Sequence, residues 1–153
     1  MVANIDSAKE ISHITVKEES LLQSFEHPIV LLRRKVTGPL ASNIAPGIEE
    51  LGVMLPYTPL HRLLFVQENC PKALVMTSGN ISGSPICTKN NDAVSRLGHL
   101  ADNFLLHNRE ILTRVDDSVV KITQDEPLIL RRASGYAPVK LTTKLELPQI
   151  LGC

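Results

Sequence analysis

The segment LGVMLPYTPLHRLLFV, residues 51–66, decides the fold because it predicts a strand, a turn and a helix in succession. The apolar run Leu51–Leu55 has the length of a buried strand and is followed directly by a proline. Thr58 is a favourable N-cap, and Pro59 suits the first helical position, whose amide makes no intrahelical hydrogen bond. The leucines beyond it recur at i, i+3 and i+4, the spacing of one helix face: Leu60, Leu63 and Leu64.

The same order of elements returns downstream. The run Ala73–Met76 predicts a second buried strand, which leads into a polar loop at residues 77–85. Asn91 or Asp92 is a candidate N-cap for a helix over residues 93–97. The chain therefore alternates strands with helices through its middle.

The flanking segments supply the remaining elements. Two short helices are expected within residues 1–24, the second opened by a capping box between Thr15 and Glu18. Further apolar runs predict strands, the last two of them pairing as a hairpin: 29–32, 104–106, 118–122 and 128–130. Alternating strands and helices with a late β-pair indicate an α/β (α+β) domain with a mixed sheet of about five strands.

The composition excludes several classes of protein. Among 153 residues, 16 basic and 16 acidic side chains cancel, which argues against a dedicated nucleic-acid binder. No apolar run approaches the roughly 18 residues of a membrane span, and no segment reads as a signal peptide. Three cysteines without a CxxC pair, and histidines without ligand spacing, support neither a disulfide framework nor a protein-held metal centre. We expect a cytoplasmic, globular chain without a membrane partner.

The polar loop Thr77–Pro85 is the richest candidate for chemistry. It follows a predicted strand, at a place where backbone amides and side chains can face an anion or a planar amide. Gly79 permits close approach of the backbone, whereas Ser78 and Asn80 offer donors and acceptors. The same residue types are common in ordinary turns, and composition alone favours that interpretation.

Two further clusters carry charge. Asp116 and Asp117 can help to hold a magnesium ion between nucleotide phosphates, with Ser118 donating to a phosphate oxygen; the alternative is a plain turn before a strand. Arg131 and Arg132 enter a glycine turn and have guanidinium groups suited to bidentate phosphate contacts. A solvated basic pair fits the same spacing equally well.

His61 and Cys87 are weaker candidates. His61 stands beside the leucines of a predicted helix, which favours a half-buried structural histidine over a ligand. No histidine lies near Cys87 in sequence to act as its base, so a catalytic thiol is not supported.

Five motifs follow one another in a fixed order: GVMLPYTPLH (52–61), MTSGNISG (76–83), PIC (85–87), RVDDSV (114–119) and LRRASGYAP (130–138). Together they resemble the YrdC-like domain of the HypF carbamoyltransferases, whereas Ser78 and Asn80 alone mark only the wider YrdC superfamily. The resemblance implies a twisted mixed sheet flanked by helices in a partial YrdC-like domain, residues 1–141. Residues 142–153 are then an extended C-terminal tail.

The resemblance also implies a reaction. Such a domain combines carbamoyl phosphate with ATP, in the presence of Mg²⁺, into carbamoyl adenylate, and releases phosphate and pyrophosphate. The whole protein then passes the carbamoyl group to HypE, on the route to the cyanide ligands of NiFe hydrogenases. By position, Ser78 and Asn80 are the expected catalytic residues. The residues expected to bind ATP are Thr77, Ser78, Asn80, Ser118, Arg131 and Arg132.

Two departures from the family pattern matter. Met54 stands at about the place where threonylcarbamoyl-adenylate synthases carry an arginine, which favours a carbamoyl product. The family's lysine- and arginine-bearing phosphate-binding stretch is not found after Met1, so we expect the N-terminal strands to be missing. Two alternatives stay open, a threonylcarbamoyl-adenylate synthase for tRNA modification and a double-stranded RNA-binding module. Zero net charge and few aromatic residues disfavour the RNA-binding module.

Overall fold

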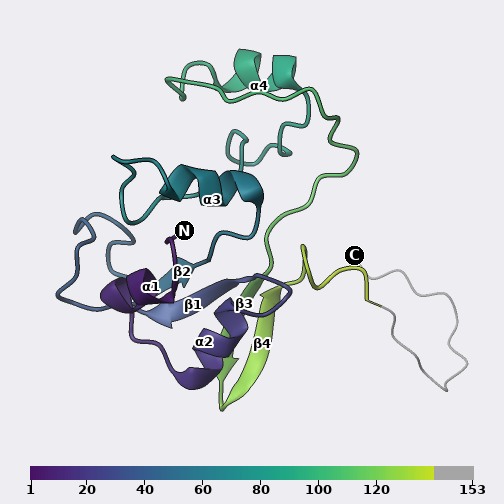
Figure 1. Cartoon of the computed structure of the whole chain (residues 1–153). Coiled ribbons are helices and arrows are strands. Elements are labelled where there is room, and N and C mark those ends of the chain that lie inside the picture. Colours follow the sequence, from purple (N-terminus) through teal and green to yellow (C-terminus); the bar gives the residue numbers. More distant parts are fainter. Residues whose placement is uncertain (140–153) are drawn as a thin grey trace, which may run out of the picture.

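A computed structural model of the chain describes residues 1–139 (Figure 1). The helices and strands of this part are, in chain order, α1 Ile5–Ile11, α2 Val16–Leu22, β1 Ile29–Arg33, β2 Glu50–Val53, α3 Pro59–Phe65, α4 Asn90–Leu97, β3 Val119–Thr123 and β4 Glu126–Arg131. The predicted α/β architecture is confirmed. None of these helices is long and apolar enough to cross a membrane. The predicted boundary at residue 141 and the predicted tail, 142–153, lie outside the described residues.

The sheet is mixed, with the strand order β2-β1-β3-β4. β1 pairs antiparallel with β2 and parallel with β3, while β3 and β4 form the predicted antiparallel hairpin. The parallel pairing joins Ile29 to Val119 and Val30 to Val120. As a result, the start of β1, the end of β2, the start of β3 and the end of β4 all lie at one end of the sheet.

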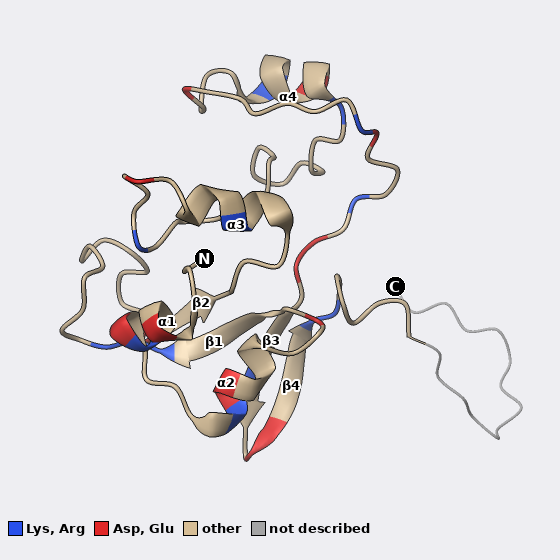
Figure 2. Cartoon of the chain, viewed as in Figure 1, with Lys and Arg blue, Asp and Glu red and all other residues tan. Residues whose placement is uncertain are grey.

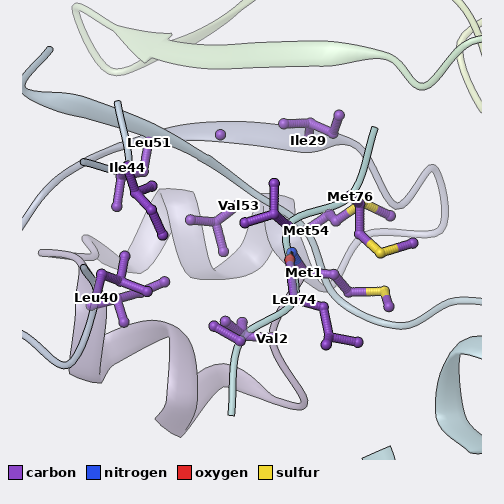
Figure 3. A pocket seen from close by; sticks show the side chains of 14 residues that line it. Met1, Val2, Ile29, Leu40, Ile44, Leu51, Val53, Met54, Leu74 and Met76 are labelled. Carbon is purple, nitrogen blue, oxygen red and sulfur yellow. Dashed lines mark hydrogen bonds between the residues drawn. The ribbon is translucent and has the colours of Figure 1, made fainter. Parts of the chain in front are cut away.

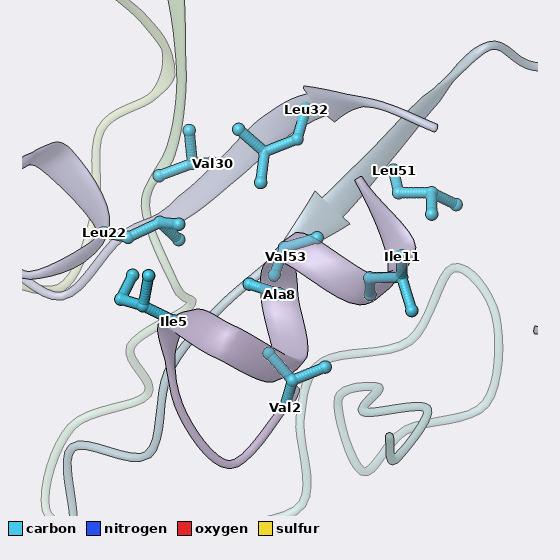
Figure 4. Packing of buried hydrophobic residues seen from close by; sticks show 9 residues of the cluster. All are labelled: Val2, Ile5, Ala8, Ile11, Leu22, Val30, Leu32, Leu51 and Val53. Carbon is cyan, nitrogen blue, oxygen red and sulfur yellow. The ribbon is translucent and has the colours of Figure 1, made fainter. Parts of the chain in front are cut away.

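Helices α1 and α2 cover one face of this sheet. Figure 4 shows the side chains of β1 and β2 directed toward the two helices. The buried cluster is Val2, Ile5, Ala8, Ile11, Leu22, Val30, Leu32, Leu51 and Val53. Each large aliphatic side chain buried there stabilises the fold by about 1.5–3 kcal/mol. On the opposite face of β1, Ile29 and Leu31 are only half-buried.

Local sequence signals explain three of the elements. The Thr15 hydroxyl accepts from the Glu18 amide at 3.3 Å, and the Glu18 carboxylate accepts from the Thr15 amide at 2.8 Å, which is the predicted capping box. Thr58 caps α3 by accepting from the His61 amide at 3.1 Å. The hairpin turns at Gln124 and Asp125, both with positive φ, as a two-residue type I′ loop requires.

Two predicted strands are wrong. Residues 73–76 form a single isolated bridge, between Ala73 and Val2, and residues 104–106 form no strand. Val75 is 80% exposed and Leu105 is 76% exposed. A short apolar run becomes a strand only where another backbone lies alongside it over several residues. Residues 73–74 meet only Met1 and Val2, and residues 104–106 make no backbone hydrogen bond within the described part of the chain. The sheet of the described residues therefore has four strands, not about five.

The two later helices also differ from expectation. Neither α3 nor α4 contributes a buried residue, and both lie apart from the packed core (Figure 1). The predicted inner face of α3 is open, since Leu60 is 49% exposed and Leu63 57% exposed. In α4 the N-cap is Lys89, and the predicted caps Asn91 and Asp92 lie inside the first helical turn.

The turn after β4 makes a close approach that only glycine allows. Gly135 has a φ of +79°, and a Cβ there would lie 2.5 Å from the backbone oxygen of Glu26. Gly83 has a similar φ of +75° but no neighbouring atom within 4 Å of such a Cβ. Comparing substitutions at Gly135 and Gly83 therefore separates the cost of a positive φ from the cost of a steric overlap.

We expect Gly135→Ala to destabilise the chain by about 1–3 kcal/mol more than Gly83→Ala. Both variants force alanine into a left-handed conformation, but only the first drives a methyl group into the backbone of Glu26. Urea unfolding followed by circular dichroism measures both free energies. Equal losses in the two variants would show that the contact with Glu26 has no energetic weight.

Candidate active site

A polar cavity of about 390 Å³ lies at the end of the sheet where β1 and β3 begin. Its volume falls within the range usual for small-molecule sites. Its wall is built from the start of β1, the segment between β2 and α3, the loop after residue 76, the segment before β3 and the end of β4. Figure 2 shows the acidic segment entering β3 and the basic residues leaving β4 at this end of the sheet.

The cavity gathers predicted residues that are far apart in sequence. Thr77, Ser78 and Arg131 all line it, together with Asp116 and Asp117. Arg131 Nη1 lies 3.5 Å from Asp116 Oδ1, and both side chains are about half exposed. An ion pair this exposed contributes little stability, so the guanidinium can exchange its partner for an incoming anion.

A β-bulge aims Arg131 at the cavity. Val120 pairs with Ile129 and Val119 pairs with Arg131, which leaves Leu130 as an extra residue in β4. Successive strand residues face opposite sides, so without this extra residue Arg131 would share the helix-covered face with Val120. With the bulge, Arg131 stands beside Val119 on the same face as the cavity.

Two smaller or more open cavities adjoin the first, and Asp116 lines all three. Ser78 and Asn80 line one of about 270 Å³. Arg131 and Arg132 line the other, of about 430 Å³. Every predicted site residue except Ser118 thus lines at least one of three cavities, and the three cavities share Asp116.

The loop after residue 76 is organised by the side chain of Asn80. Its Nδ2 donates to the backbone oxygens of Ile81 at 3.1 Å and Ser84 at 2.9 Å, and its Oδ1 accepts from the Ser78 hydroxyl. Its carboxamide is therefore engaged within the loop, and Ser78 is the member of the predicted pair that also lines the 390 Å³ cavity. Asn80 fixes the direction of the Ser78 hydroxyl.

Ser118 and Arg132 are held in other ways. Ser118 is buried, and its hydroxyl donates to the Ser134 backbone oxygen at 2.9 Å and accepts from the Ala133 amide at 2.7 Å. These bonds tie the start of β3 to the chain that leaves β4. Arg132 is exposed and donates to the backbone oxygen of Tyr136 at 3.3 Å.

The structure adds a group that the sequence reading missed. The Tyr57 hydroxyl donates to Asp117 Oδ1 at 3.0 Å, and the Tyr57 ring meets the His61 ring edge-on, with centroids 5.0 Å apart. All three side chains line the 390 Å³ cavity. His61 was expected to be structural, yet the leucines beside it are exposed. The available signal was position, since Tyr57 and His61 directly follow a strand that ends at the site.

Burial and charge set the protonation of this group. The pKa of Tyr57 is raised to about 12, chiefly by desolvation, then by the charge of Asp117 and the hydrogen bond to it. Desolvation lowers the pKa of His61, against an opposing effect from Asp117. At neutral pH, Tyr57 is therefore a hydrogen-bond donor and His61 a neutral imidazole.

A separate hollow of about 170 Å³ lies beside the N-terminus (Figure 3). Aliphatic and methionine side chains line it, among them Val2, Leu40, Ile44 and Leu74, and no charged side chain does. It is smaller than typical ligand sites and offers few polar groups to orient a substrate. The polar cavity is therefore the candidate active site.

We expect Asp117→Asn to lower the pKa of Tyr57 below its value of about 12, because the substitution removes the neighbouring charge. The chain has two tyrosines, so the titration is read in a Tyr136→Phe background by tyrosinate absorbance. Asp92→Asn, on α4, is the matched control and leaves the pKa unchanged. An unshifted midpoint in the Asp117 variant would mean that the two groups do not interact in solution.

Three comparisons relate this chain to known proteins. The family model Sua5_yciO_yrdC, described as telomere recombination, matches residues 1–133. The carbamoyltransferase HypF of Synechocystis is 54% identical over 125 residues, which cover 82% of this chain and 16% of that protein. HypF2 of Cupriavidus necator is 44% identical over 169 aligned residues, which cover 99% of this chain and 21% of that protein.

Solved structures give the same match. A full-length HypF in the phosphate- and nucleotide-bound form superimposes with a TM-score of 0.84 at 46% identity, over 90% of this chain and 21% of that chain. HypF of T. kodakarensis gives a TM-score of 0.85 at 41% identity, and the match covers 90% of this chain and 18% of that chain. The chain thus spans about a fifth or less of the length of these relatives.

Proposed function

Because this chain belongs to the Sua5/YciO/YrdC family, in the form found in HypF carbamoyltransferases, we propose that it forms carbamoyl adenylate from carbamoyl phosphate and ATP. The observation that carries the proposal is the meeting of Ser78 and Arg131 in one polar cavity beside two carboxylates. A full-length HypF that is 46% identical to this chain over the matched region has been solved in a phosphate- and nucleotide-bound form.

The proposed reaction balances with one water molecule. Hydrolysis of carbamoyl phosphate gives carbamate and inorganic phosphate, and a carbamate oxygen then attacks the α-phosphorus of ATP. The new P–O bond forms as the bond to the bridging oxygen breaks, and pyrophosphate leaves with the electron pair. A site for this chemistry must hold anionic groups in line and neutralise them.

Several side chains of the cavity suit these tasks. Arg131 can replace its half-exposed contact with Asp116 by a bidentate contact with phosphate. The Thr77 hydroxyl can donate to a phosphate oxygen, and the Ser78 hydroxyl can do so by exchanging its bond to Asn80 Oδ1 for one to phosphate. Arg132, in the adjoining cavity, extends the basic rim for the remaining phosphates. Ser118 supports the site from behind by holding the chain after β4 in place.

Magnesium fits the Asp116 carboxylate, which lies at the junction of the cavities. Within residues 1–139, no group of three acidic, histidine or cysteine side chains stands ready to hold a metal ion. Mg²⁺ characteristically binds through one or two carboxylates together with water and substrate phosphates. Asp116, which lines all three cavities, would supply such a carboxylate, and the ion would neutralise phosphate charge, whereas Asp117 is engaged by Tyr57.

The wider role follows from the relatives. We propose that the carbamoyl group passes through other parts of a HypF-type protein to HypE, for the cyanide ligands of NiFe hydrogenases. Because the reaction consumes ATP, we place it in the cytoplasm.

Ser78→Ala and Arg131→Ala are each expected to weaken binding of ATP with Mg²⁺ by about tenfold, the loss of one hydrogen bond to a charged group. Isothermal titration calorimetry on the whole chain measures the affinities. Arg96→Ala, in the last turn of α4, is the matched control and should bind as the unmodified chain does. Absence of ATP binding, or equal affinities in all four proteins, would contradict the proposal.

A further inference from the structure

We propose that Asp117, held by Tyr57 and flanked by His61, forms the subsite that recognises the amide hydrogens of the carbamoyl group. This inference rests on the proposed function and deepens it, because it assigns the part of the cavity that distinguishes a carbamoyl group from other acyl groups.

The first argument is the geometry of the Asp117 carboxylate. Its Oδ1 accepts from Tyr57 at 3.0 Å, and within the described residues its Oδ2 has no hydrogen-bond donor. Tyr57 is itself wedged between two imidazoles, edge-on to His61 at 5.0 Å and stacked on His27 at 5.7 Å. The carboxylate is thus fixed through Oδ1 by a rigid ring, and Asp117 lines the cavity with an oxygen to spare.

The second argument is chemical complementarity. A carbamoyl group carries two N–H donors and one carbonyl acceptor, whereas an acetyl group of similar size carries only the acceptor. An ionised carboxylate accepts hydrogen bonds and donates none, so Asp117 can accept from the N–H groups of a carbamoyl group. The neutral imidazole of His61 offers one N–H for the carbonyl oxygen. Tyr57 acts as a positioning residue, because it orients Asp117 and bounds the space.

The third argument concerns larger substrates. A threonylcarbamoyl group carries a threonine on the same nitrogen, and the carboxylate of that threonine would approach Asp117 if the nitrogen occupied this subsite. The one side-chain cation lining this cavity among the described residues is Arg131, which Asp116 already contacts at 3.5 Å. Met54, on the cavity wall, brings no charge. Like charges brought together in this way oppose binding, so the subsite selects the unsubstituted carbamoyl group.

Acetyl phosphate is the probe that separates this subsite from general phosphate binding. It matches carbamoyl phosphate in size and in its phosphate group but lacks the N–H donors. The whole chain is loaded with Mg²⁺ and a non-hydrolysable ATP analogue, and each acyl phosphate is titrated by calorimetry. We expect the unmodified chain to prefer carbamoyl phosphate by about tenfold or more.

Substitution of Asp117 should remove this preference. In Asp117→Ala the two acyl phosphates should bind within about twofold of each other, while the affinity for the ATP analogue stays unchanged. Asp117→Asn keeps an acceptor oxygen and should retain part of the preference, which covers the case of an unfolded alanine variant. Tyr57→Phe should give a partial loss, and Asp92→Asn should change nothing.

The outcomes separate the two proposals. If the unmodified chain binds neither the nucleotide nor the acyl phosphates, the proposed function fails and the subsite fails with it. If the nucleotide binds but the unmodified chain does not discriminate, only the subsite is overturned. A preference that survives in Asp117→Ala and Asp117→Asn overturns it as well.

Discussion

The parallel pairing of β1 with β3 is the contact on which the site depends. It consists of two residue pairs, with an added hydrogen bond from the Ile29 amide to the Ser118 oxygen at 2.8 Å. Val30 and Val120 lie fully buried at this seam, so hydrophobic burial offsets the entropy of closing a long loop. Because the seam joins two distant parts of the chain, it brings the segments around Tyr57 and Asp117 to one end of the sheet. The chain that leads to Ser78 is held separately, by the backbone bonds of Leu74 to Met1.

Elements with local causes could be predicted from the sequence. The capping box at Thr15, the proline at the start of α3 and the turn of the β3–β4 hairpin act within a few residues, so their patterns predict structure directly. The failed strands, 73–76 and 104–106, show the limit. Apolar composition predicts that a segment prefers burial, but a strand also needs a neighbouring backbone, which only the tertiary fold provides.

The site was predictable in part for the same reason. The polar loop with Ser78 and the basic strand end at Arg131 stand out by composition, and the structure brings them to one cavity. The bulge at Leu130 does not stand out, because leucine is ordinary in a strand, yet it decides which face Arg131 occupies. The hydrogen bond from Tyr57 to Asp117 joins residues that are 60 positions apart, so no local sequence pattern predicts it.

The charge balance of the cavity bears on the proposed function, because phosphate substrates would need a cation there. Among the described residues, two carboxylates and one guanidinium line it, so its wall is negative before any substrate enters. Phosphate groups alone would meet repulsion from Asp116 and Asp117, which grows as water is displaced. Under the proposed function, a divalent ion at Asp116 would neutralise that carboxylate and free Arg131 to contact phosphate. The acidic pair then serves both ends of the cavity, since Asp116 faces the phosphate side and Asp117 the side of Tyr57.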